Sequence, residues 1–98
     1  MAVVLIARFD GDVEQLTSVY DEAHRLIMER GGPPAELRHH CAVGDGALYI
    51  IGVWESEEAM RARFASDVFK ETLASAGFPS FDTAELTVLQ LHAIEPPL

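Results

Sequence analysis

The hydrophobic positions along the chain predict four β-strands. Residues 2–9 (AVVLIARF) and 47–54 (ALYIIGVW) are short, nearly continuous apolar runs. Such runs are typical of central strands, which are covered on both faces. Residues 36–43 and 84–94 mix apolar and polar positions more evenly, as strands with one exposed face do. Two central strands and two edge strands are therefore expected.

The segment after the first strand predicts a helix. Asp12 is a good N-cap, and Gln15 occupies the position that completes a capping box. Apolar residues then recur at three- and four-residue spacing, at Val13, Leu16, Val19, Tyr20, Ala23, Leu26 and Ile27. This spacing marks one face of a helix. The sequence GGPP at residues 31–34 ends it.

A second helical pattern begins after Ser56 and continues to Gly77. Ser56 is an N-cap, and the acidic residues 57–58 complement the helix dipole. The apolar positions are Ala59, Met60, Phe64, Val68, Phe69 and Leu73. Residues 66–67 (Ser-Asp) are a potential break that would divide the pattern into two shorter helices.

The predicted order β-α-β-β-α-β is typical of a ferredoxin-like α+β fold. In this fold an antiparallel four-stranded sheet has its first and third strands in the centre, and the helices cover one face. We expect residues 1–98 to form a single domain of this kind. The other face of the sheet remains apolar, so a second sheet from another copy is its natural cover and a homodimer is expected.

The hairpin between the second and third strands contains two adjacent histidines, joined by a Gly-Asp-Gly turn to the only tryptophan. If the turn contains two residues, Trp54 lies opposite Leu37 and shares its face with His39. If the turn contains three residues, Trp54 lies opposite Glu36 and shares its face with His40. One residue of slip thus decides which histidine lies beside Trp54.

Composition and charge exclude several classes of partner. With 49% hydrophobic and 23% charged residues the chain is an ordinary globular one. Its net charge of −9 argues against binding to nucleic acid or to an anionic membrane. A single cysteine, Cys41, forms no intrachain disulfide, and the apolar start lacks a basic region and is too short for a signal or a membrane span. A cytoplasmic location is expected.

Residues 53–71 (VWESEEAMRARFASDVFKE) resemble the dimeric α/β-barrel superfamily. Its members include the antibiotic-biosynthesis monooxygenases and the heme-degrading monooxygenases, and the element order agrees over the whole chain. Members of the antibiotic-biosynthesis branch use no metal or flavin and oxidise electron-rich phenolic or anthrone-like substrates with dioxygen. The resemblance therefore implies an enzyme without a cofactor.

The heme-degrading branch fits the sequence less well. In that branch the helix after SDVFKE supplies a histidine to the iron, whereas this chain has Leu73 there, or Thr72 with a shift of one residue. Neither side chain binds iron. No other metal site is expected, because adjacent histidines diverge on a strand and no two histidines stand four residues apart.

Oxidation of a hydrophobic aromatic molecule requires an apolar cavity, aromatic walls and a base. The candidates for the wall are Trp54, Phe64, Phe69 and Tyr49. Arg8 lies toward the end of a central strand, where its charge needs either a carboxylate or an acidic group of the ligand. A structural salt bridge is the simpler expectation for Arg8.

The candidates for the base are His40 and His39. Strand alternation groups His39 with the apolar residues Leu37, Cys41 and Val43. Small proteins of the superfamily carry an H-x-A motif on the second strand, and residues 40–42 resemble it, which favours His40. We take His40 as the first candidate. A solvated histidine on an edge strand is the simpler alternative for both.

Three functional hypotheses follow. The first is a cofactor-independent monooxygenase-like or cyclase-like enzyme that acts on a hydrophobic aromatic small molecule. The second is a non-catalytic dimer that binds a small ligand or has a structural role. The third is a heme-binding or heme-degrading protein with atypical ligation.

Overall fold

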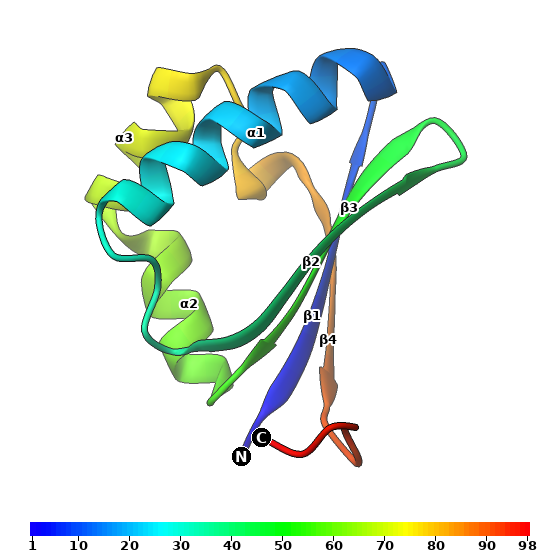
Figure 1. Cartoon of the computed structure of the whole chain (residues 1–98), viewed down its shortest axis with the longest axis vertical. Helices are drawn as coiled ribbons and strands as arrows, with labels where there is room; N and C mark the ends of the chain where they lie inside the picture. The colour runs from blue at the N-terminus through cyan, green and yellow to red at the C-terminus, as the bar shows by residue number, and fades with distance from the viewer.

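The structure, a computed structural model, describes residues 1–98 (Figure 1). The strands are β1 (Val3–Asp10), β2 (Glu36–Gly44), β3 (Ala47–Trp54) and β4 (Glu85–Gln90). The helices are α1 (Val13–Glu29), α2 (Glu57–Ala65) and α3 (Asp67–Ala76), and a 3-10 turn, η1, covers Phe81–Thr83. None of the helices combines the length and the apolar composition that crossing a bilayer requires.

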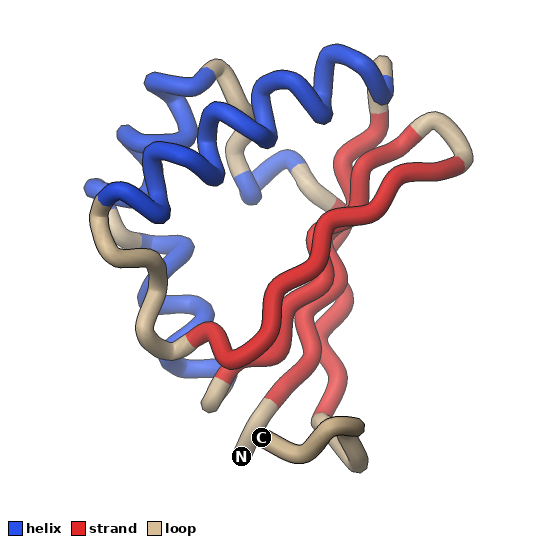
Figure 2. Tube along the Cα trace, in the orientation of Figure 1, coloured by secondary structure: helices blue, strands red, loops and turns tan.

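The four strands form one antiparallel sheet in the order β2-β3-β1-β4. The two strands with continuous apolar runs, β1 and β3, occupy the centre, as predicted. All helices lie on one side of the sheet, and the other side carries none (Figure 2). The predicted ferredoxin-like α+β fold is therefore confirmed.

The main core lies between the helices and the sheet. Alternate residues of β1 point into it and are buried: Val3, Leu5, Ala7 and Phe9. Phe9 is 3% exposed and meets the rings of Phe78 and Phe81 edge-on, with centroid distances of 4.9 and 5.1 Å. This aromatic contact ties the central strand to the segment between α3 and β4.

Ser66 divides the second helical segment into α2 and α3. Its backbone N–H donates to the carbonyl of Arg63, which closes α2, and its hydroxyl accepts from the N–H of Phe69, which caps α3. One serine therefore serves as both C-cap and N-cap, and the potential break at residues 66–67 is confirmed.

The last strand is shorter than the predicted range 84–94. It ends at Gln90 because its only neighbour, β1, begins at Val3, the residue that pairs with Gln90. One further bond, from the N–H of Leu91 to the carbonyl of Ala2 at 3.0 Å, continues the pairing. The apolar pattern beyond it extends past the partner strand, so it forms no further ladder.

The C-terminal residues connect the two edges of the sheet. They leave β4 and end near the N-terminus (Figure 1). The guanidinium of Arg38, on the opposite edge strand β2, donates to the carbonyls of Pro96 and Pro97 at 3.4 and 3.3 Å. The C-terminal tail therefore extends from the β4 edge to the β2 edge at this end of the sheet.

Candidate functional site

The β2–β3 hairpin turns through two residues. Gly44 pairs with Ala47, and Asp45 and Gly46 between them have φ values of 53° and 69°. Two successive positive φ values define a type I′ turn, which Asp-Gly strongly favours. Of the two registers considered, the two-residue turn is therefore the one formed.

A β-bulge at Leu37 changes the register at the other end of this hairpin. Glu36 pairs with Trp54, but Arg38 pairs with Val53, so Leu37 is an extra residue on β2. Side chains three apart on a regular strand point to opposite faces. Because of the bulge, the side chains of Glu36 and His39 lie on the same face as Trp54, where they contact each other.

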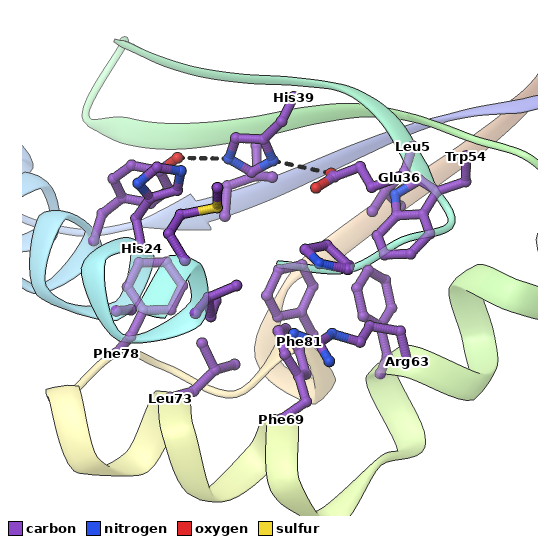
Figure 3. Close-up of a pocket in the computed structure, with 17 residues that line it drawn as sticks. Leu5, His24, Glu36, His39, Trp54, Arg63, Phe69, Leu73, Phe78 and Phe81 are labelled. Atoms are coloured by element: carbon purple, nitrogen blue, oxygen red, sulfur yellow. Dashed lines mark hydrogen bonds and ion pairs between the residues drawn. The ribbon is translucent and has the colours of Figure 1, made fainter. Parts of the chain in front are cut away.

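A cavity of about 100 Å³ lies between this face of the sheet and the helices (Figure 3). Enclosed cavities of this size hold one small aromatic ring, but this cavity is partly open to solvent, so a ligand with further fused rings would extend out of it. Most of its lining is apolar, with contributions from Leu5, Ile27, Ile50, Trp54, Phe64, Phe69, Leu73, Phe78 and Phe81. The polar lining residues are Tyr20, His24, Glu36, His39 and Arg63.

Three of these polar residues form a hydrogen-bonded relay. Tyr20 Oη lies 2.5 Å from His39 Nε2, and His39 Nδ1 lies 2.9 Å from Glu36 Oε2 (Figure 3). Burial raises the pKa of Tyr20, and the neighbouring Cys41 and Glu36 raise it further. A phenol held neutral is a donor, so Nε2 accepts from it and Nδ1–H donates to the carboxylate. The carboxylate thus fixes the tautomer of the imidazole.

His24 joins the relay by ring stacking. Its ring lies 5.7 Å from that of Tyr20 and 5.6 Å from that of His39, nearly parallel to both, and the Tyr20 and His39 rings are 6.0 Å apart, so the three rings form a triangle. The α1 residues Tyr20 and His24 are four apart and so lie on the same side of the helix. Helix α1 therefore fixes the orientation of the His39 ring from above the sheet.

Gly52 makes room for two functional groups. A Cβ at this position would lie 2.6 Å from Glu36 Oε2 and 3.0 Å from Trp54 Nε1. The first distance is shorter than real Cβ atoms show, and the second is tighter than most of their contacts. The absence of a side chain on β3 is therefore what allows the carboxylate and the indole to lie side by side at this end of the cavity.

The aromatic wall is continuous on the helix side. The ring of Phe64 lies 5.8 Å from Trp54, 5.7 Å from Phe69 and 4.4 Å from Phe81, and it is stacked on the last two. Stacked and edge-on rings of this kind contribute beyond their buried area. Two buried donors at this wall, Trp54 Nε1 and Arg63 Nε, have no hydrogen-bond partner.

No family model matches the chain, and neither does any curated protein. Several solved structures do. SnoaB, a cofactor-independent oxygenase from Streptomyces nogalater, is 21% identical over 98% of each chain, with a TM-score of 0.67. Rv0793 from Mycobacterium tuberculosis is 16% identical over 97% of this chain and 99% of that one (TM-score 0.68). A candidate antibiotic biosynthesis monooxygenase from Caulobacter crescentus is 14% identical over 94% of this chain and 91% of that one (TM-score 0.70).

The chain shares the fold of the antibiotic biosynthesis monooxygenases. At these identities the likeness is one of fold, and it extends over nearly the whole chain. The superfamily resemblance found in residues 53–71 is thereby confirmed at this level.

Within this monooxygenase fold, four of the predicted site residues lie together. His39, Trp54, Phe64 and Phe69 all line the cavity. They come from β2, β3, α2 and α3, so the fold brings together positions that are up to 30 residues apart. The roles assigned to these residues remain predictions.

The other three predicted site residues lie on the opposite face of the sheet. His40 pairs with Ile51, which places it on the side without helices, so the preference for His40 as the pocket-facing histidine is corrected to His39. The two-residue turn is the reason. Tyr49 and Arg8 pair with each other across β1 and β3 on that same side, so neither lines the cavity.

Arg8 has protein partners in place of a ligand. It donates to Asp10 Oδ1 at 2.8 Å and to the hydroxyl of Tyr49 at 2.7 Å. Its guanidinium carbon also lies 5.3 Å from the centroid of the Tyr49 ring. These contacts are the structural salt bridge that was the simpler expectation for Arg8.

Sequence reasoning missed four polar members of the site. Tyr20 is part of the apolar stripe of α1, and His24 is one turn further along the same helix. Glu36 precedes the bulge, and Arg63 is one of several scattered basic residues. Two rings that carry polar atoms, four residues apart in the middle of an amphipathic helix, are the signal that points to Tyr20 and His24.

Proposed function

We propose that the chain is a cofactor-independent oxygenase-type enzyme, monooxygenase-like or cyclase-like, that acts on a hydrophobic aromatic small molecule. The observation that carries this proposal is the Tyr20–His39–Glu36 relay in the wall of an apolar cavity. A carboxylate, an imidazole and a hydroxyl in series form an arrangement that moves a proton. The description of SnoaB, which has this fold, as a cofactor-independent oxygenase supports the same class.

In the proposed reaction the relay removes a proton from the substrate. An anthrone, in its hydroxy tautomer, gives its proton to the oxygen of Tyr20 while Tyr20 gives its own proton to His39 Nε2. Tyr20 remains neutral, in keeping with its raised pKa, and His39 becomes an imidazolium. Glu36 stabilises this charge through the bond it already makes to Nδ1.

The substrate anion then reacts with dioxygen. One electron passes from the anion to O₂, and the resulting superoxide and substrate radical combine to form a C–O bond. The peroxide takes the proton held by His39. Loss of the remaining ring C–H proton with cleavage of the O–O bond gives a carbonyl and water. One CH₂ group and one O₂ are converted to one C=O and one H₂O.

An oxygen electrode tests this proposal. We expect purified protein with anthrone and a chelator to consume one O₂ for each anthraquinone formed, without added flavin or metal ion. The quinone is followed by its absorbance in parallel. Uptake that does not exceed the rate without protein, or that is restored only by a metal ion or flavin, contradicts the proposal.

Non-catalytic binding of a small ligand is the second candidate function. The volume of the cavity favours it, since about 100 Å³ is below the range of roughly 300–1,000 Å³ usual for drug-sized ligands. Under this hypothesis an aromatic molecule binds with no oxygen uptake. The electrode measurement therefore distinguishes the two candidates.

We also propose that the helix-free face of the sheet binds a second copy of the chain. This face presents half-buried Val4, Ile6 and Ile51, and Leu89 is 52% exposed. Two sheets that bury such faces against each other form a stable packing arrangement.

Light scattering after size-exclusion chromatography measures this association. We expect twice the chain mass of 10.8 kDa for the natural protein and a single chain mass for Ile51→Glu, because a carboxylate in the interface loses its water. Val43→Glu is the matched control, since Val43 is 50% exposed on the opposite face of the same hairpin. A dimer that survives Ile51→Glu contradicts this interface.

A further inference from the structure

Arg63 is a cation in the cavity wall without a protein partner. Its side chain takes part in no ion pair and no hydrogen bond, and its Nε is buried. Three other arginines, Arg8, Arg25 and Arg61, each pair with a carboxylate. The side chain is half-buried and forms no ion pair with a carboxylate of the chain, so an anionic group of a ligand would stabilise it.

The guanidinium of Arg63 is nevertheless held in place. Its central carbon lies 4.9 Å from the centroid of the Phe69 ring, on the aromatic wall. Burial lowers the pKa of Arg63, and the carboxylate of Glu36 counteracts this change. Glu36 forms no ion pair with Arg63, and its carboxylate accepts from His39. The Arg63 guanidinium is thus held in place, but no ion pair neutralises its charge.

Trp54 is a second, independent donor at the same end of the cavity. The residue is 3% exposed, and its Nε1–H is buried without a partner. Buried donors are nearly always hydrogen-bonded, and an exception calls for an explanation. In Figure 3, Trp54 and Arg63 lie at one end of the cavity, whereas His24 and Phe78 lie at the other.

We propose that Trp54 and Arg63 form a subsite for an anionic oxygen, so that the aromatic ligand of the cavity carries a carboxylate. The inference rests on the proposed function, in that the cavity is taken as the substrate site. A guanidinium and an indole N–H both donate to a carboxylate, and the apolar wall receives the rings. Because Glu36 lies beside the Trp54 indole, the acid group is expected on the Arg63 side of this end of the cavity, and the reacting part of the molecule faces Tyr20 and His39.

Binding of two matched probes tests this subsite. The probes are 2-naphthoate and its neutral analogue 2-naphthamide. The chain contains one tryptophan, so a single indole N–H resonance in a ¹H–¹⁵N spectrum reports on Trp54. We expect 2-naphthoate to shift this resonance downfield and to bind about 10- to 100-fold more tightly than the amide, the range for a hydrogen bond to a charged group.

Two variants assign the preference to Arg63. Arg63→Met keeps the apolar stem and removes the charge, and we expect it to lose the preference for 2-naphthoate while it still binds 2-naphthamide. Arg63→Lys, which retains the charge without the fork of donors, is expected to keep part of the preference. Arg61→Met is the control for charge alone, because Arg61 is exposed on the same helix and pairs with Glu57; it should leave the preference intact.

The outcomes separate this inference from the proposed function. Equal binding of both probes, or a preference that persists in Arg63→Met, overturns the subsite. Failure of both probes to bind also overturns it, since a site for an aromatic anion must bind one. Oxygen uptake with anthrone, which carries no carboxylate, reports on the proposed function in each case.

Discussion

Replacement of His39 by alanine is expected to reduce the rate of anthrone oxidation by about 100- to 10,000-fold, the contribution of a positioned general base. The imidazole is the only group that connects the Tyr20 hydroxyl to the Glu36 carboxylate, at 2.5 and 2.9 Å. Without it the proton leaving the substrate has no acceptor. Oxygen uptake at saturating anthrone measures the loss.

His40→Ala is the matched control for this experiment. His40 is the adjacent residue, is exposed, and lies on the face without helices, so its loss should leave the rate unchanged. Added imidazole should restore part of the activity of His39→Ala, because it can enter the space left by the ring. A rate that falls with His40→Ala and not with His39→Ala would show that the substrate reacts on the helix-free face of the sheet.

Phe9→Ala is expected to lower the free energy of unfolding by about 3–5 kcal/mol. Phe9 is 3% exposed, and its ring makes edge contacts with Phe78 and Phe81. Its removal leaves a cavity in the middle of the core and deletes both aromatic contacts. Because the free energy of unfolding of a domain of this size is roughly 5–15 kcal/mol, the variant keeps only a small part of its stability.

Urea and thermal denaturation measure this change. The melting temperature should fall by about 12 °C or more, since each kcal/mol corresponds to roughly 4–8 °C in a domain this small. Val68→Ala also shortens an apolar side chain, but Val68 is 55% exposed on α3, so its effect should stay within about 0.5 kcal/mol. Similar losses for the two variants would contradict the placement of Phe9 in the core.

The fold follows from the sequence because each of its elements has a local signal. The two apolar runs are buried on both faces only in the centre of a sheet. Ser56 caps α2 as predicted, and Ser66 divides α2 from α3 at the predicted break. The end of β4 was not predicted, because a strand stops where its neighbour stops. The apolar pattern of residues 91–94 carries no information about where β1 begins.

The site was less predictable because it depends on the register of one hairpin. The turn type decides between His39 and His40, and both turns are compatible with Gly-Asp-Gly. Glu36 and His39 meet only through a bulge that no local signal marks. Arg63 differs from the other arginines in having a buried Nε without a hydrogen-bond partner beside the cavity, which is a property of three-dimensional packing.

The bulge at Leu37 also has a consequence for evolution. A one-residue insertion in a strand normally reverses every side chain beyond it, whereas a bulge absorbs the extra residue at one point. If Leu37 were lost, Arg38 would still pair with Val53, and Glu36 would follow directly opposite Trp54, on the same face as His39. The same relay is thus compatible with two spacings, Glu-x-x-His in a bulged strand and Glu-x-His in a regular one. Homologous sites are to be sought with both, and an alignment that scores a gap here as a disruption would overlook them.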